Sequence, residues 1–409
     1  MSENAPGPRF GLERMLPRDP NEPHRVASSL ELFFDLVFVI AVSTASSQLH
    51  HSLSSGHAGP GIVSYLMVFF AIWWAWMNFT WFATSFGIDD WLYRVITIVQ
   101  MAGVLVLAAG VGPVFDEHEP DFTIVVIAYV VMRVAMIAQW LRASRRNPEL
   151  RATTRVYAAG IGIVQVLWIG LLFVPDVMKP VVFLVLVLAE LAIPVIAERR
   201  GSTPWHPHHI TERYSLFTLI VLGESLLASA TAIIGAREQV DAIGPLIWVA
   251  VVTLISTAAM WWIYFWPPHH TAITTLRRSL TYGYAHYFVF AAAGAFSAGI
   301  ELWIDELTGH TDLPPIVTSF ATSVPIAVFL FGIWFVAIRE NADRVVNTAV
   351  PLGAVLVLLD PLLPIPVTLT AVILGAAVVV LVVRRPQPRG EARMGRSEAI
   401  HGRDPEPRA

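Results

Sequence analysis

Long apolar runs separated by short polar stretches organise nearly the whole chain. A bilayer core of about 30 Å takes about 20 helical residues, and twelve runs reach or approach that length. The runs cover residues 29–49, 61–84, 91–111, 122–142, 154–174, 180–197, 211–234, 245–266, 279–301, 317–338, 345–359 and 362–383. Because they are continuously apolar, they exclude a transmembrane β-barrel and predict an all-α polytopic membrane protein.

One run is weaker than the others as a membrane span. Residues 345–359 are short for a crossing and contain Pro351. Two interpretations therefore stay open at this point. The chain crosses twelve times, or it crosses ten times and the last two runs form a re-entrant hairpin.

Composition narrows the class of protein further. The 409 residues are 55% hydrophobic and 14% charged, whereas a soluble domain is about 25% charged. The net charge is −4 and no segment forms a basic domain, which excludes a nucleic-acid binder. The chain has no cysteine, so disulfides, thiolate metal sites and cysteine nucleophiles are excluded.

The positive charges predict the orientation of the spans. Of the 27 lysines and arginines, 24 lie in the two ends and in every second loop, and one, Arg133, lies inside a span. The six other loops hold only Lys179 and Arg237. Cytoplasmic loops are enriched in Lys and Arg, so this split predicts an even number of crossings, with both termini in the cytoplasm.

Similar features recur about half a chain apart. Glu31 and Glu212 each open an apolar run 181 residues apart, and the pairs Trp73-Trp74 and Trp261-Trp262 are 188 apart. This period predicts two parallel six-helix halves, residues 29–205 and 206–383. A polar segment, residues 1–28, precedes them, and an arginine-rich tail, residues 384–409, which we expect to be disordered, follows. The alternative is chance, because tryptophans favour membrane interfaces anyway.

Three charged residues fall near the middle of their runs. Arg133, Glu190 and Glu224 would each cost about 2.5–3.5 kcal/mol if left at the bilayer centre. We expect them to face the bundle interior, with Arg133 paired to Glu224 or Glu190. The carboxylate left over would then suit a proton relay, and Glu224 is the favoured one. The alternative is a structural ion pair that fixes helix register.

A second polar group lies near the inner end of two runs. Glu31 and Asp35 are four residues apart, so they share one helix face. Glu212 and Arg213 open the run 211–234 at the same level, which predicts a pair between Arg213 and Asp35. The dipole of the helix N-terminus explains Glu31 well and Asp35 less well.

The histidines give weaker signals. His286 lies among aromatic residues and is either a packed, hydrogen-bonded ring or a proton carrier. The histidines at 206, 208, 209, 269 and 270 lack the fixed spacing of a metal site, so we expect no metal and no cofactor. The motifs HExxH, GxSxG and the P-loop are absent, which makes an enzyme the less favoured class.

Three stretches carry a family resemblance. ELFFDLVFVIA (31–41), HHITERYSLFTLIVLGES (208–225) and YGYAHYFVFAAAGAFSAGIE (282–301) resemble the bacterial low-temperature-requirement A (LtrA) family over roughly residues 25–385. The resemblance implies a polytopic membrane protein and no established reaction. The motif positions that it singles out are Glu31, Asp35, Glu212, Arg213, Glu224 and His286.

The buried charges favour one function over two others. We expect a secondary transporter or ion permease that couples a small solute or ion to protons or cations through intramembrane carboxylates. The alternatives are an intramembrane enzyme acting on a lipid-linked substrate and a non-transporting sensor or scaffold. The expected surroundings are the lipid bilayer, and the oligomeric state stays open.

Overall fold

A computed structural model describes residues 11–23, 25–116, 118–237 and 243–386. These residues form helices, turns and loops without a strand, as the sequence predicts. The long helices are α1 (Ser29–Ser54), α2 (Ala58–Phe86), α3 (Trp91–Ala109), α5 (Thr123–Arg146), α6 (Arg151–Leu171), α7 (Lys179–Glu198), α8 (Pro207–Ala236), α9 (Gly244–Phe265), α10 (Leu276–Thr308), α11 (Pro315–Ile333), α13 (Arg344–Leu359) and α14 (Thr368–Val383). The short α4 (Val111–Val114), α12 (Arg339–Asn341) and a π-helical turn, Trp334–Ile338, join some of them.

Eleven helical segments within the described residues are long and apolar enough to cross a membrane. The run at 345–359, which looks weak in the sequence, is among them as Arg344–Leu362. The last run is the shorter one, since α14 has 16 residues and a length of about 24 Å. Its helix begins late because Pro361, Pro364 and Pro366 lack the N–H group that a continuing helix needs.

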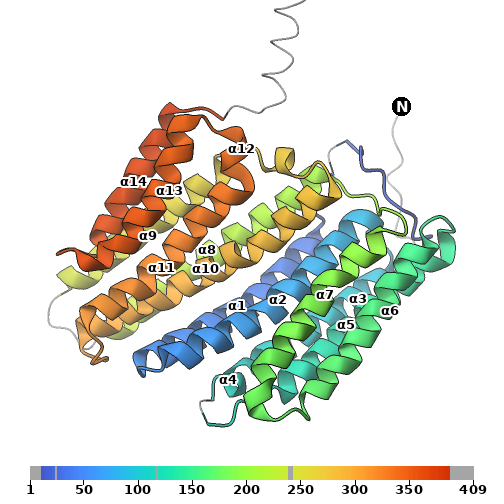
Figure 1. The fold of residues 1–409 in the computed structure, drawn as a ribbon, viewed down its shortest axis with the longest axis horizontal. Coiled ribbons are helices and arrows are strands. Elements are labelled where there is room, and N and C mark those ends of the chain that lie inside the picture. The colour runs from blue at the N-terminus through green and yellow to red at the C-terminus, as the bar shows by residue number, and fades with distance from the viewer. Residues whose placement is uncertain (1–10, 24, 117, 238–242, 387–409) are drawn as a thin grey trace, which may run out of the picture. The chain divides into compact units, whose positions relative to one another are not determined.

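The chain divides into two compact units, Met1–Ile220 and Val221–Ala409. In unit 1, α1 packs on α2 and α3, and α3, α5, α6 and α7 pack on one another in that order (Figure 1). In unit 2, α10, α11, α13 and α14 pack in the same order, and α14 also packs on α9. The predicted repeat and its boundary at 205/206 stay predictions, and the two compact units divide inside α8.

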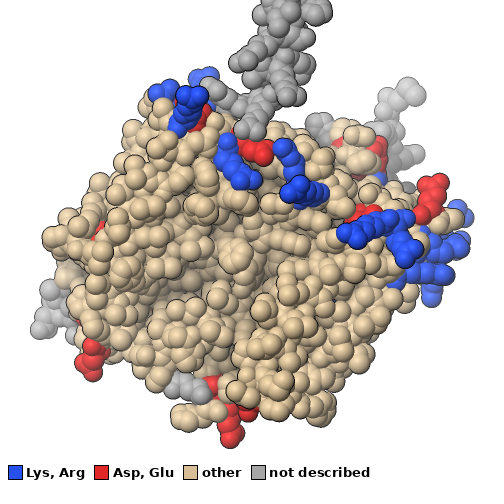
Figure 2. All heavy atoms as spheres, in the orientation of Figure 1, with Lys and Arg blue, Asp and Glu red and all other residues tan. Residues whose placement is uncertain are grey.

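The surface shows the pattern of a membrane protein. Figure 2 shows lysine, arginine, aspartate and glutamate side chains gathered at helix ends on the visible face, with broad uncharged flanks between them. Many large apolar side chains of the described residues are exposed, for example Ile163, Val166 and Val185. Lipid contact gives these residues an apolar environment that water would not.

The segment before α1 is bound to unit 1 at several points. We call residues 11–23 and 25–27 the N-terminal strap. Its Arg18 N–H donates to the Ser85 carbonyl at 2.9 Å, and its Met15 is buried at 1% exposure. The side chain of Asn147 donates to the Met15 carbonyl at 2.9 Å. The strap is therefore part of the fold of unit 1 at the end where α1 begins.

Candidate functional site

The predicted pair between Asp35 and Arg213 is present inside unit 1. The guanidinium of Arg213 on α8 donates twice to Asp35 on α1, from Nη2 to Oδ1 at 2.5 Å and from Nε to Oδ2 at 3.1 Å. The indole N–H of Trp76 on α2 donates to the same Oδ1 at 2.7 Å. All three side chains have an exposure of 0%, so the charges are held entirely by protein groups.

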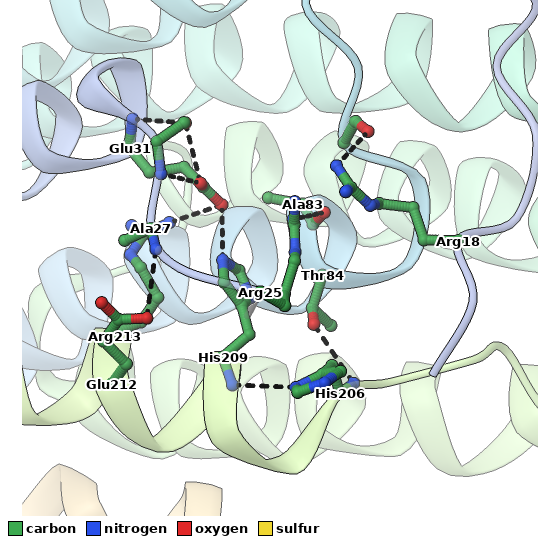
Figure 3. A network of polar contacts seen from close by, with 12 residues as sticks. Arg18, Arg25, Ala27, Glu31, Ala83, Thr84, His206, His209, Glu212 and Arg213 are labelled. Carbon is green, nitrogen blue, oxygen red and sulfur yellow. Dashed lines mark hydrogen bonds and ion pairs between the residues drawn. The ribbon is translucent and has the colours of Figure 1, made fainter. Parts of the chain in front are cut away.

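Glu31 extends this pair toward the helix end. Its Oε1 lies 3.1 Å from Nε2 of His209 and 3.2 Å from Nη1 of Arg213. Its Oε2 accepts from the backbone N–H of Ser28 at 2.7 Å, completing the capping box of α1. We call Glu31, Asp35, His209 and Arg213 the inner carboxylate cluster. Figure 3 shows Glu31, His209 and Arg213.

The local sequence explains why these four residues meet. Glu31 and Asp35 are one helical turn apart on α1, and His209 and Arg213 are one turn apart on α8, so each pair lines one face. Arg213 thus touches both carboxylates and His209 touches one. Glu212 points elsewhere, since its Oε2 accepts from the Ala27 N–H of the strap at 3.1 Å.

The charges of the inner carboxylate cluster do not balance when His209 is neutral. Two carboxylates face one arginine, which leaves a net charge of about −1 inside a span. Buried charges are costly unless they are paired. One proton within the cluster restores neutrality, and His209 is the residue type whose charge changes most readily near neutral pH.

A chain of polar contacts leads from the inner carboxylate cluster to the strap. The His209 backbone N–H donates to Nδ1 of His206 at 3.2 Å, and Nε2 of His206 lies 3.0 Å from the Glu22 carbonyl. A carbonyl only accepts, so Nε2 of His206 carries the hydrogen and Nδ1 is the acceptor. Glu22 is fixed in turn by Arg18, whose hydrogen bonds hold the pKa of that carboxyl below its usual value.

Arg25 brings a second arginine close to this end of the inner carboxylate cluster. Its Nη2 donates to the Ala83 carbonyl at the end of α2, at 3.2 Å, and its side chain is half-buried. Figure 3 shows it beside His209 and Glu31. The strap therefore adds a positive charge beside Glu31 and His209 of the inner carboxylate cluster.

A separate ion pair lies deeper in unit 1. Nη2 of Arg133 on α5 lies 3.4 Å from Oε1 of Glu190 on α7, and both side chains are 1% exposed. Of the two partners that the sequence left open, Glu190 is the one present. The indole of Trp74 donates to Glu190 Oε2 at 2.8 Å, and that of Trp168 donates to Oε1 at 3.2 Å.

Arg133 has hydrogen-bond donors that its contacts with the described residues do not use. Its Nη2 donates to the Tyr129 hydroxyl, and its carbon Cζ lies 4.4 Å from the centroid of that ring. Its Nε and Nη1 have no hydrogen-bond partner among the described residues. A cavity of about 20 Å³ is lined by Tyr129 and Trp168, which contact the pair, and by apolar side chains, but not by Arg133 or Glu190 themselves. This volume is about that of one water molecule.

In unit 2, His286 is part of a closed network of rings. Its Nδ1 lies 2.7 Å from the Tyr282 carbonyl and its Nε2 lies 3.3 Å from the Tyr264 hydroxyl. His269 completes the network, with Nε2 at 2.7 Å from the Tyr264 carbonyl and Nδ1 at 2.9 Å from the Tyr282 hydroxyl. Each ring donates to a carbonyl, so each remaining nitrogen accepts from a tyrosine, which is the arrangement of neutral imidazoles. Burial lowers the pKa of His269 to about 4.

Glu224 lies on the part of α8 that belongs to unit 2. Its side chain is half-buried, and it follows Gly223 in the helix. The neighbouring Ser225 donates to the Ala293 carbonyl of α10 at 3.2 Å. Its predicted role as a proton carrier stays a prediction.

Several site residues were missed in the sequence. His209 was weighed only as a metal ligand, although its position four residues before Arg213 could have placed it on the same face. Trp74, Trp76 and Trp168 were not expected as indole donors to buried carboxylates. No group of three or more metal-binding side chains occurs among the described residues.

The fold defines a multi-pass helical membrane protein with buried charged clusters. The chain belongs to the family of the bacterial low temperature requirement A protein (LtrA), whose sequence model matches residues 26–384. It is also 30% identical over 258 residues to an uncharacterized protein of Rhizobium meliloti (strain 1021). That match covers 61% of this chain and 60% of the relative, so the chain spans less than two thirds of the relative's length.

Proposed function

We propose that this protein is a proton-coupled secondary transporter of the bacterial inner membrane, with both termini in the cytoplasm. The inner carboxylate cluster is its coupling site. One observation carries the proposal: two fully buried carboxylates share one arginine, and a histidine lies 3.1 Å from one of them. Ionisable groups inside a span are functional sites by default because their burial is so costly.

The mechanism follows from the contacts of Arg213, which donates two hydrogen bonds to Asp35 and forms an ion pair with Glu31. With His209 neutral, Arg213 serves both Glu31 and Asp35. With His209 protonated, the imidazolium balances the charge of Glu31, and Arg213 can then pair with Asp35 alone. Protonation of His209 therefore changes the contacts that α8 makes with α1. Because α8 continues into unit 2, this change acts on a helix that both units share.

The other predicted residues take supporting roles in this proposal. Glu224, on the same helix as Arg213, is a second protonation site. Arg133 and Glu190 form a neutral pair, and the two unpartnered donors of Arg133 offer a hydrogen-bonding point on the solute pathway. His286 keeps a packing role, since both of its ring nitrogens already have partners.

Flux measurements test the proposal. Full-length protein in liposomes that contain a pH dye is given an imposed proton or cation gradient. We expect wild type to move protons and Asp35→Asn to lose that flux by about 100-fold, the usual size of a lost proton-transfer group. Asp89→Asn is the matched control, because Asp89 is exposed and pairs with Arg94 at the surface. Normal flux in a correctly folded Asp35→Asn protein contradicts the proposal.

A non-transporting sensor or scaffold is the second candidate. It is favoured by the pairing of Asp35, Glu190 and Arg213 and by the water-sized cavity in unit 1. A lipid-linked enzyme would place these carboxylates in the wall of a lipid-sized groove, and the groove of about 490 Å³ in unit 1 is lined by other residues. Absence of flux in wild type under every common gradient would favour the sensor.

A further inference from the structure

A groove of about 490 Å³ lies at the end of unit 1 where the strap runs. Its volume is in the range of small-molecule sites, about 300–1,000 Å³. Three segments form its walls: the strap, the loop between α5 and α6, and the loop before α8. The lining residues that matter here are Pro17, Arg18, Asn147, Glu149, Ser202 and Pro204.

Five arginines lie on the segments that flank this groove. Arg145 and Arg146 directly precede Asn147, Arg151 directly follows Leu150, and Arg199 and Arg200 precede Ser202. All five are exposed, and none forms an ion pair among the residues that the structure describes. Each of the five lies within three positions of a lining residue in the sequence. The groove, whose lining is part polar and part apolar, therefore lies between segments that carry exposed arginines.

The strap also turns apolar side chains outward beside the groove. Leu12 and Leu16 are 60% and 51% exposed, while Met15 between them is buried. Leu16 directly precedes the groove residue Pro17. Exposed leucines and arginines on one segment at the end of the spans suit the boundary between headgroups and acyl chains.

We propose that this groove binds the phosphate-bearing headgroup of an anionic phospholipid. Arg18, which also holds the Glu22 carboxylate, lines the groove, the five flanking arginines add positive charge for the phosphate, and Leu12 and Leu16 contact the start of the acyl chains. Basic pockets at the ends of membrane helices bind such headgroups, and each nearby arginine contributes about 1 kcal/mol, a factor of about five in affinity. Glu149 is the one carboxylate in the groove wall and opposes the binding. The inference does not depend on the transport proposal.

Lipid binding to the full-length protein tests the inference. The protein is purified in detergent and titrated with phosphatidylglycerol, phosphatidylcholine or inorganic phosphate, and bound lipid is counted by native mass spectrometry. We expect retention of phosphatidylglycerol, little retention of phosphatidylcholine, and no competition by inorganic phosphate. Full competition by inorganic phosphate would identify a free-phosphate site and overturn the lipid assignment.

Three variants and one control locate the site. Arg145→Gln with Arg146→Gln should weaken phosphatidylglycerol binding about 25-fold, two factors of about five. Ser202→Trp should block the groove without changing charge, and Glu149→Gln should strengthen binding. Arg277→Gln with Arg278→Gln removes the same charge from unit 2 and should leave binding unchanged. An equal loss in that control, or normal binding by Ser202→Trp, overturns the proposal.

Discussion

Arg213 and Asp35, 178 residues apart in the chain, form a two-point contact with N···O distances of 2.5 and 3.1 Å. The contact is fully buried and joins the first membrane helix to α8. Removal of one partner of a buried ion pair costs about 3–5 kcal/mol, because it leaves the other charge uncompensated. Removal of both, with apolar groups of similar volume, is often neutral.

Arg213→Met should therefore destabilise the protein strongly, by about 3–5 kcal/mol, and Arg213→Met combined with Asp35→Leu should recover most of that loss. Thermal unfolding of purified protein in one detergent measures both. The double variant should still lack proton flux. If the double variant is no more stable than the single one, the pair does not act as a unit.

His209→Gln should keep the fold and lower proton flux by about 100-fold, since glutamine fills similar space but carries no proton. Flux across a pH series and unfolding temperature give the two readouts. His208→Gln is the matched control, because His208 is the exposed neighbour one position earlier. Equal flux in the two variants would remove His209 from the proton path.

Trp74→Phe should destabilise unit 1 by about 1–3 kcal/mol, because Glu190 loses the indole donor at 2.8 Å while it stays buried. Trp262→Phe is the control, since Trp262 is 43% exposed and occupies the corresponding place in the predicted repeat. Thermal unfolding compares the two. A larger effect in Trp262→Phe would contradict the assigned role of Trp74.

Acid should destabilise unit 2 through His269. Its folded-state pKa of about 4 lies below the usual 6.5, so the unfolded chain binds a proton that the folded protein excludes. Stability from this residue is complete above pH 6.5 and is lost as pH falls toward 4, by roughly 3 kcal/mol in total. Unfolding temperature at pH 7 and pH 4.5, for wild type and His269→Gln, measures it. The variant should show the smaller drop.

The sequence predicts the fold well because spans are set by long local apolar runs. The late start of α14 was missed, because it depends on three prolines that precede the helix. A run of apolar residues continues through such prolines, so hydropathy does not show where the helix begins. The Asp35–Arg213 pair was predictable, because both charges sit at the same depth of their runs. The partner of Arg133 was not, since depth alone leaves Glu190 and Glu224 equivalent. Indole donors were missed because side-chain direction depends on helix rotation, which apolar runs do not encode.

The long sequence separations in unit 1 bear on how the protein is made. Asp35 emerges from the ribosome 178 residues before Arg213, and Glu22 emerges 184 residues before His206. At about 5–20 residues per second, α1 waits about 10–35 seconds for its arginine. During that time α1 carries Glu31 and Asp35, which are costly to place in the bilayer unless they are protonated or shielded from lipid by other groups. The first helix therefore reaches its final state only after α8 has been made, and slowing synthesis before α8 should lengthen its exposure to membrane proteases.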